Sequence, residues 1–298
     1  MNLNNGHDLH ESETQPNAKR QKVSHQSNGN IDEKRPHLLA SSDDASSDDT
    51  SSKSHEETLQ KNQFGDMVTD PDISTDEWVN IWKKGKTKFH KKDVHSIIKT
   101  YLPRLIEGKK NPTFLLPLCG KSVDMKWLLD QGLNVSGCEI AEEGVEQFFQ
   151  ENNIDFTVES LGGKIEGKLY KGKKLPVTIY VCDFFELPSV TSCRYDCVWD
   201  RGSLAAINTK DRSRYCNVMK KLLKADGRWL LDVFELDHVK FAGPPFNQDT
   251  EELRQLIGIQ YDFEQLRRKD AMNPWSETWG VSYFIVKDFL IQQKSDNI

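Results

Sequence analysis

Small and charged residues follow several apolar runs that predict buried β-strands. Ligands of parallel sheets bind at the carboxyl ends of the strands, so the residues just after these runs are the first candidates for chemistry. They are Leu118, Cys119 and Gly120, then Glu139, then Asp183, and finally Asp200 with Arg201. No Ser-His-Asp or Cys-His motif accompanies them, which leaves the binding of a small ligand as the chemistry to consider.

The turn at Gly120 argues against two nucleotide-binding classes. Gly120, Lys121 and Ser122 match the end of a P-loop, but that motif requires a glycine five positions earlier, where this chain has Leu115. A dinucleotide site needs GxGxxG after the first strand, and this turn has a single glycine. A nucleoside without a phosphate group remains as the ligand.

Glu139 is the residue that suits such a ligand. It ends the second predicted strand, 19 residues after Gly120, where a carboxylate can accept hydrogen bonds from both ribose hydroxyls. That spacing suits S-adenosylmethionine, although acidic residues at strand ends are common. The alternative is that Glu139 only caps the helix that follows.

Alternating strand and helix patterns position these residues. Ser74 with Glu77 fits a capping box that begins the first of two amphipathic helices, and strands then alternate with helices. The predicted strands are residues 113–118, 134–140, 177–181, 195–199 and 229–234, with an antiparallel pair at 259–267 and 279–291. This order predicts an α/β fold, with a mostly parallel sheet covered on both faces and an antiparallel C-terminal hairpin at one edge.

Composition divides the chain near residue 72. Residues 1–72 contain 14 acidic and seven basic residues and a single aromatic residue, Phe64, whereas the rest contains 32 acidic and 33 basic residues. So few apolar groups cannot offset the entropy of ordering the chain. We therefore predict a disordered, acidic, Ser-rich tail at 1–72 and one domain at 73–298.

The same composition limits compartment and partners. The chain has no apolar run of membrane-spanning length and no signal-peptide pattern, so we expect a cytoplasmic protein. Lys19, Arg20 and Lys22 would suit nuclear import, although chance basic residues in a solvated tail are the alternative. Six cysteines without CxxC spacing predict buried thiols and no metal site. The near-neutral body argues against nucleic acid.

Four longer strings closely resemble the thiopurine S-methyltransferase family, in order and with family-like spacing over residues 74–291. They are Trp78-x3-Trp82-x2-Gly85-Lys86-Thr87-x-Phe89-His90, Pro117-Leu118-Cys119-Gly120-Lys121-Ser122-Val123-x-Met125-Lys126-Trp127, Trp199-Asp200-Arg201-Gly202-x-Leu204-x-Ala206-Ile207-Asn208, and Gly243-Pro244-Pro245-Phe246. The resemblance implies a Rossmann-like class I methyltransferase, with a seven-stranded sheet and an N-terminal helical cover.

The resemblance also implies roles for individual residues. Those implied for S-adenosylmethionine are Trp78, Trp82, Phe89, Leu118, Gly120, Glu139, Ile140, Asp183, Phe184 and Arg201, and those for the acceptor are Phe89, Arg201 and Arg254. A member of the family carries Ser where Asp183 stands, and an Asp there can still accept from the adenine amino group. For the tryptophans the alternative is core packing, and for Arg254 a solvated helix face.

The implied reaction is methyl transfer to the sulfur of an aromatic or heterocyclic thiol. Such thiols ionise readily, so we expect no obligatory protein base, and His90, Asp200 and Cys119 are candidates that we disfavour. We expect a monomer that acts on a small molecule, without nucleic acid, membrane or metal. The alternatives are another soft nucleophile, such as hydrosulfide, a selenol or an inorganic chalcogen, or a non-catalytic binding protein on the same fold.

Overall fold

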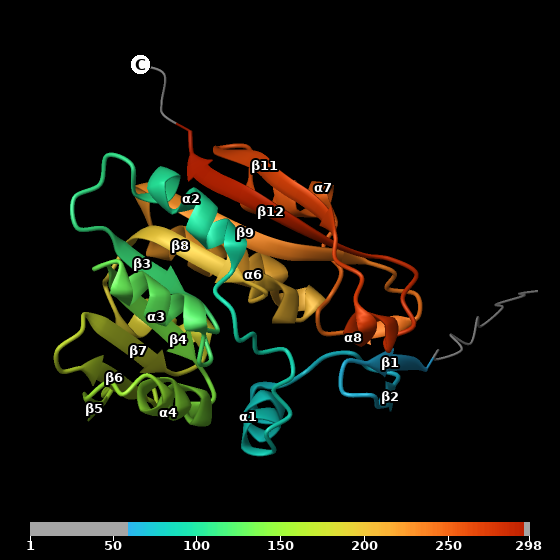
Figure 1. Ribbon diagram of the computed structural model, residues 1–298, viewed down its shortest axis with the longest axis horizontal. Coiled ribbons are helices and arrows are strands. Elements are labelled where there is room, and N and C mark those ends of the chain that lie inside the picture. Colours follow the sequence, from blue (N-terminus) through green and yellow to red (C-terminus); the bar gives the residue numbers. More distant parts are fainter. Residues whose placement is uncertain (1–58, 295–298) are drawn as a thin grey trace, which may run out of the picture. The chain divides into compact units, whose positions relative to one another are not determined.

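The computed structural model describes residues 59–294, which belong to one compact unit of the chain. Within them, nine strands form one sheet in the order β11-β12-β9-β8-β3-β4-β7-β6-β5 (Figure 1). The bounds of these strands are β3 Thr113–Leu116, β4 Asn134–Glu139, β5 Phe156–Ser160, β6 Lys168–Gly172, β7 Val177–Val181, β8 Tyr195–Arg201, β9 Leu223–Leu236, β11 Tyr261–Asp270 and β12 Phe284–Gln293. Neighbours among β7, β4, β3, β8 and β9 are parallel, as predicted.

Both edges of the sheet are antiparallel. At one edge β12 pairs with β9 and with β11, which confirms the predicted C-terminal hairpin. At the other edge β6 pairs with β7 and with β5, two strands that the sequence reading did not predict. Strand β5 is mostly exposed, and β6 has lysine at two of its five positions, so neither has the apolar run by which buried strands are recognised. They enlarge the predicted seven-stranded sheet without changing the fold class.

Helices cover both faces of the sheet. The helices are α1 Thr75–Lys83, α2 Ser96–Ile106, α3 Val123–Asp130, α4 Glu142–Glu151, α5 Leu187–Val190, α6 Arg212–Leu222, α7 Thr250–Ile257 and α8 Pro274–Glu277, with short 3-10 turns at Phe184–Glu186, Leu204–Ala206 and Thr209–Asp211. Successive residues of a strand point to opposite faces, so Leu116 packs in the core with α2, α3 and α4, whereas Leu115 packs with α5, α6 and α7. None of the helices within residues 59–294 is long and apolar enough to cross a membrane.

The first helix begins as its sequence predicts. The Ser74 hydroxyl accepts from the Glu77 backbone N–H at 3.2 Å, and the Glu77 carboxylate accepts from the Ser74 backbone N–H at 2.8 Å. These two bonds form the predicted capping box.

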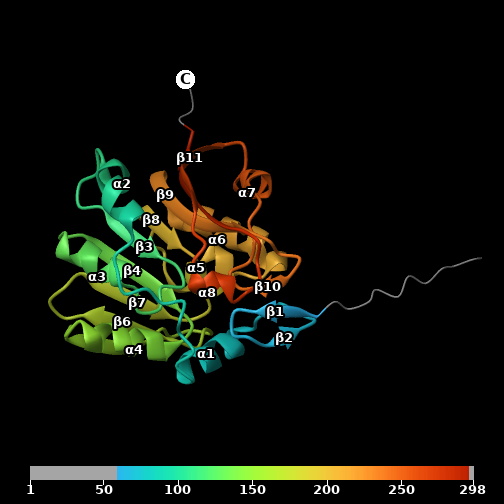
Figure 2. The ribbon, with the colours of Figure 1, turned by 45° about the vertical axis from the view of Figure 1, so that its right-hand side comes forward.

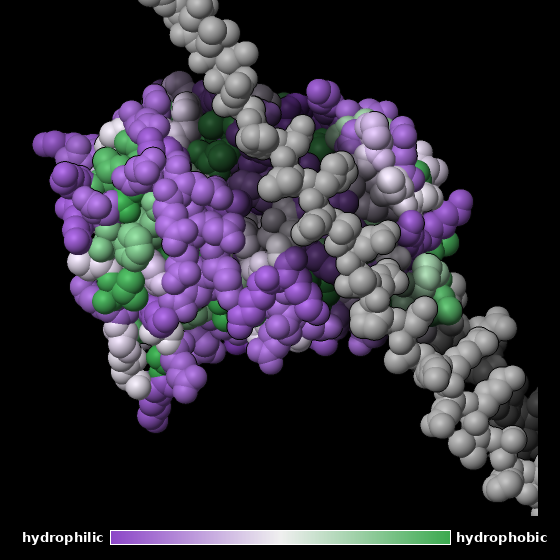
Figure 3. All heavy atoms as spheres, turned by 60° about the horizontal axis from the view of Figure 1, so that its bottom comes forward, coloured by the Kyte–Doolittle hydropathy of each residue, from purple (hydrophilic) through white to green (hydrophobic). Residues whose placement is uncertain are grey.

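On the visible face in Figure 3, hydrophilic residues dominate and apolar residues lie in small separate groups.

Residues 59–72 correct the predicted boundary of the domain. Strand β1 (Gln60–Asn62) pairs in parallel with β10 (Phe241–Gly243) and antiparallel with β2 (Met67–Val68), beside α1 in Figure 2. The Gln60 amide also donates to the carbonyls of His238 and Val239 at 2.9 and 2.8 Å. Backbone pairing and side-chain hydrogen bonds hold this segment in place. Amino-acid composition gives no information on such contacts, which is why it places the segment in the tail. The remainder of the predicted tail, including Lys19 to Lys22, lies outside the described residues.

Two truncations should separate these parts of the chain. Removing residues 1–58 leaves every described contact intact, so we expect unchanged thermal unfolding and methyl transfer. Removing residues 1–72 deletes the β1–β2 hairpin and should lower stability by about 1–2 kcal/mol, because several hydrogen bonds and the packing of Phe64 on Trp78 are lost. Differential scanning calorimetry of both truncations tests this, and equal melting temperatures would contradict the role given to the hairpin.

Candidate active site

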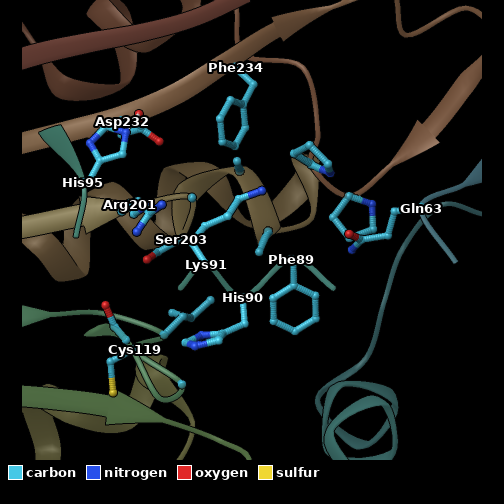
Figure 4. Close-up of a pocket in the computed structure, with 18 of the residues that line it drawn as sticks. Gln63, Phe89, His90, Lys91, His95, Cys119, Arg201, Ser203, Asp232 and Phe234 are labelled. Carbon is cyan, nitrogen blue, oxygen red and sulfur yellow. Dashed lines mark ion pairs between the residues drawn. The ribbon is translucent and has the colours of Figure 1, made fainter. Parts of the chain in front are cut away.

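A cavity of about 390 Å³ opens at the carboxyl ends of the central parallel strands. One side, here called the strand-end wall, consists of Leu118, Cys119, Gly120, Glu139 and Ile140. The opposite side, here called the aromatic wall, consists of Phe234, Trp275, Trp279 and Phe284. The loop between α1 and α2 crosses between them and contributes Phe89, His90 and Lys91, which Figure 4 shows in the cavity.

Glu139 is the buried acid of the strand-end wall. Its two carboxylate oxygens accept from the backbone N–H groups of Gly120 and Ala141, at 2.8 and 2.9 Å. Ala141 is the N-cap residue of α4, so Glu139 supports that helix end and also lines the cavity. Burial raises the pKa of Glu139 above its usual range, although the backbone N–H groups of Ala141 and Gly120 oppose this. Glu139 therefore supports the helix end, as its alternative states, and it also lines the cavity, where binding of a ribose stays a prediction.

Because Gly120 has no side chain, the indole of Trp82 can pack directly against the strand-end wall. A Cβ at Gly120 would lie 2.6 Å from Cζ2 of Trp82, and the glycine has a φ of +48°, which other residues rarely adopt. Phe89 meets the rings of Trp78 and Trp82 edge to face, with both centroid distances at 5.9 Å. The three rings predicted from the sequence thus lie together over one end of the cavity.

Arg201 enters the cavity from the end of β8 and is held by Asp124. Its guanidinium donates to Oδ2 of Asp124 at 3.1 Å. The same carboxylate accepts from Nε1 of Trp199 and from the backbone N–H of His95, both at 2.8 Å. Asp124 is completely buried. It thereby ties the first turn of α3 to β8 and to the start of α2, a role that sequence reasoning missed because a helix-start Asp indicates only a cap.

The three candidate bases, together with His95, have surroundings that shift their pKa values or hold them in hydrogen bonds. Burial lowers the pKa of His90, and it lowers that of His95 to about 4 with help from Arg201. Burial raises the pKa of the Cys119 thiol well above its usual range. Asp200 lies outside the cavity lining, where Tyr215 donates to it at 2.7 Å. His95 lines the cavity together with His90.

Asp232 and Asp288 form a second acidic feature beside His95. They face each other on β9 and β12, and Oδ2 of Asp232 lies 3.7 Å from Nε2 of His95. Burial, together with the charge of Asp288, raises the pKa of Asp232 well above its usual range. A ring nitrogen of His95 and one carboxylate oxygen from each aspartate lie within 4.8 Å of one another. Asp288 already accepts a hydrogen bond from Nε of Arg267 at 2.5 Å.

Three predicted site residues do not line the cavity. Asp183 follows β7 and caps the turn after it by accepting from the backbone N–H of Phe185 at 2.9 Å, whereas Phe184 is buried against Tyr215. Arg254 is exposed on α7, near Glu251 and the ring of Phe263. Arg254 thus has the solvated position that was its alternative, and its role beside the acceptor stays a prediction.

Several cavity residues were not predicted. They are Gln63, Lys91, His95, Asp232 and the four residues of the aromatic wall. Lys91 and His95 follow Phe89 within six residues, so proximity to that motif was a usable signal. For Asp232 the signal was a charged residue within an apolar strand.

The sheet order and the cavity define a class of protein. Five parallel strands, an antiparallel C-terminal pair and an acidic residue at the end of the second parallel strand are the features of a class I S-adenosylmethionine-dependent methyltransferase. Solved structures support the fold: 1,6-didemethyltoxoflavin-N1-methyltransferase of Burkholderia thailandensis superposes with a TM-score of 0.50 at 17% identity, over 74% of this chain and 87% of that chain.

The comparison of sequences identifies the family. Residues 73–294 match the family model "Thiopurine S-methyltransferase (TPMT)". The thiopurine S-methyltransferase of Bos taurus is 36% identical over 222 residues, 74% of this chain and 91% of that protein. The probable thiopurine S-methyltransferase of Danio rerio is 35% identical over 219 residues, 74% of this chain and 94% of that protein. The chain belongs to the thiopurine S-methyltransferase family and is an enzyme that uses S-adenosylmethionine.

Proposed function

We propose that this enzyme transfers the methyl group of S-adenosylmethionine to the sulfur of an aromatic or heterocyclic thiol, such as a thiopurine. The observation that carries the proposal is the cavity itself, which places the buried Glu139 and the rings of Phe89 and Trp82 opposite an aromatic wall. Aromatic walls suit a flat aromatic acceptor more than a small inorganic one such as hydrosulfide. The non-catalytic alternative loses support for the same reason, because the cavity retains both halves of a two-substrate site.

The residues at the strand-end wall fit the cofactor. Glu139 retains lone pairs for the ribose hydroxyls beyond its two backbone bonds, and Leu118 with Ile140 supplies apolar contacts to a nucleoside. Asp183 and Phe184, at the end of β7 beside β4, are our proposed neighbours of the adenine. Trp78, Trp82 and Phe89 offer aromatic faces that attract a sulfonium cation, with Arg201 close to both substrates. The bound cofactor supplies an electrophilic methyl group and a good leaving group.

The protein contributes orientation and the exclusion of water. The aromatic cluster and the aromatic wall confine the acceptor sulfur, and fixed geometry of this kind is worth up to roughly 7–11 kcal/mol in well-aligned systems. Because His90 and His95 both have lowered pKa values, neither takes a proton from a thiol readily near pH 7. We therefore propose that the acceptor reaches the site as a thiolate, with no obligatory protein base.

The pH dependence of the rate should then follow the acceptor. An acidic heterocyclic thiol should be methylated with a kcat/KM that is nearly flat above about pH 7, whereas an aliphatic thiol with a pKa of ~8.5 should gain rate until it is ionised. The measurement is kcat/KM against pH for three thiols of graded acidity, with wild type and His90→Ala. One inflection shared by all three thiols and abolished by His90→Ala would show that a protein base exists.

Binding is the direct test of the enzyme's first step. Isothermal titration with S-adenosylhomocysteine should show a single site, and a panel of thiols, amines and alcohols should then identify sulfur as the preferred acceptor. If the protein binds S-adenosylhomocysteine but methylates no thiol in the panel, the proposed acceptor class is wrong.

A further inference from the structure

Lys91 places a positive charge in the cavity that the reaction described so far does not use. It follows Phe89 and His90 in the loop after α1, and Figure 4 shows its side chain pointing into the cavity. Its Nζ lies 4.9 Å from the centroid of the Trp275 ring. The residue is exposed through the open mouth of the cavity, so a bound acceptor could reach it.

The charge of Lys91 is not neutralised by a neighbouring carboxylate. Among residues 59–294 no ion pair or hydrogen bond joins its Nζ to an acid, whereas the other cation of the lining, Arg201, is paired with Asp124. Burial, and then repulsion from Arg201, lowers the pKa of Lys91, while Asp232 opposes this. No ion pair among the described residues joins Asp232 to Lys91, and burial with the charge of Asp288 raises the pKa of Asp232 well above its usual range, which makes it a weak partner.

The remaining titratable groups around Lys91 do not supply an anion. His90 and His95 have lowered pKa values and are neutral near pH 7. Glu139, on the strand-end wall, is engaged by two backbone N–H groups. Among the described residues that line the cavity, Lys91 is thus the cation left without a carboxylate partner, and a bound acceptor can provide one.

We propose that Lys91 holds the acceptor sulfur as a thiolate, beside the face of Trp275, and so makes the enzyme selective for anionic acceptors. This inference rests on the proposed function. The acceptor thiol releases its proton to solvent, and a sulfur lone pair then forms the new bond to the methyl carbon. The electron pair of the broken sulfonium bond stays on the leaving sulfur. The thioether product is neutral, so it loses the attraction to Lys91 and is released.

The pKa of a bound thiol tests this directly and requires no turnover. The probe is thiophenol, whose thiolate absorbs in the near ultraviolet, titrated against pH with protein saturated in S-adenosylhomocysteine. In wild type the bound thiol should ionise about one pH unit lower than free thiophenol, a roughly tenfold shift, because a cation stabilises the thiolate. Lys91→Arg should preserve the shift, whereas Lys91→Met and Lys91→Gln should abolish it. Lys92→Met, at the neighbouring exposed residue outside the cavity lining, is the matched control.

Turnover gives a second readout. The pKa seen in kcat against pH reports the bound thiol, so it should rise by about one unit in Lys91→Met, while the affinity for S-adenosylhomocysteine stays unchanged. If Lys91→Met and Lys91→Gln bind thiophenol with the wild-type pKa, the assignment to Lys91 is wrong even though thiol methylation stands. If wild type shifts the pKa of thiophenol but methylates no thiol, the proposed function fails and the assignment to Lys91 remains.

Discussion

Asp124→Ala should lower the free energy of unfolding by about 3–5 kcal/mol. The carboxylate is completely buried and accepts from Arg201, from the indole of Trp199 and from the backbone of His95. Its removal leaves three buried hydrogen-bond donors without their acceptor, and one of these donors is charged. Because Arg201 and His95 both line the cavity, methyl transfer should fall as well.

Chemical denaturation and kcat/KM measured on the same preparations test this expectation. Asp124→Asn keeps the shape and one acceptor oxygen, so it should lose less stability than Asp124→Ala. Asp130→Ala is the matched control, since Asp130 lies on the same helix, is exposed and pairs with Lys126 within one helical turn. It should change stability by no more than about 0.5 kcal/mol. A loss below 1 kcal/mol in Asp124→Ala would mean that the three donors find other partners.

The strand ends of the cavity were predictable from the sequence because local patterns encode them. A buried strand reads as an apolar run, and the residue after it lies at the carboxyl edge of a parallel sheet. Leu118, Glu139 and Arg201 were found in this way. The same logic placed Asp183 at the end of a strand, which is correct, although its side chain caps a turn and does not line the cavity.

The aromatic wall and its neighbours were not predictable in this way. Trp275 lies in the short helix α8, Trp279 in the turn after it and Phe284 at the start of β12, and only their tertiary packing brings them to residues almost 200 positions earlier. Pairing of Asp232 with Asp288 depends on the register between β9 and β12, which sequence periodicity alone does not fix. The role of Arg254 was implied by the family resemblance alone, and the structure places this side chain on the exposed face of α7.

The β1–β2 hairpin was missed for a thermodynamic reason. Composition measures how much apolar surface a segment can bury, and by that measure residues 59–72 look like a solvated tail. Their order comes from backbone pairing with β10, and from Phe64 against Trp78. Gln63 reaches the cavity as a consequence, so a segment outside the matched family region contributes to the site.

Glu139→Ala should weaken the binding of S-adenosylhomocysteine by about 1.5–3 kcal/mol, or roughly 10- to 150-fold in Kd. The loss has two sources, the charge-assisted hydrogen bonds to the ribose and the support that the carboxylate gives to the backbone of Gly120. Isothermal titration measures the loss. Glu143→Ala is the matched control, because Glu143 lies on the neighbouring helix, pairs with Lys83 at 3.9 Å and is absent from the cavity lining.

The unliganded protein allows the two sources to be separated. Burial raises the pKa of Glu139 in the folded protein above its value in the unfolded chain. Folding therefore favours the protonated carboxyl group, and the stability that this preference contributes is lost as pH rises through the folded pKa. Near neutral pH the buried charge therefore costs stability, and Glu139→Gln removes that cost while keeping an acceptor for one backbone N–H group. Its melting temperature without ligand should change little, whereas its affinity for S-adenosylhomocysteine should fall almost as far as in Glu139→Ala. Unchanged affinity in both variants would place the ribose elsewhere in the cavity, and a large loss of stability in Glu139→Gln would make Glu139 chiefly a helix-end support.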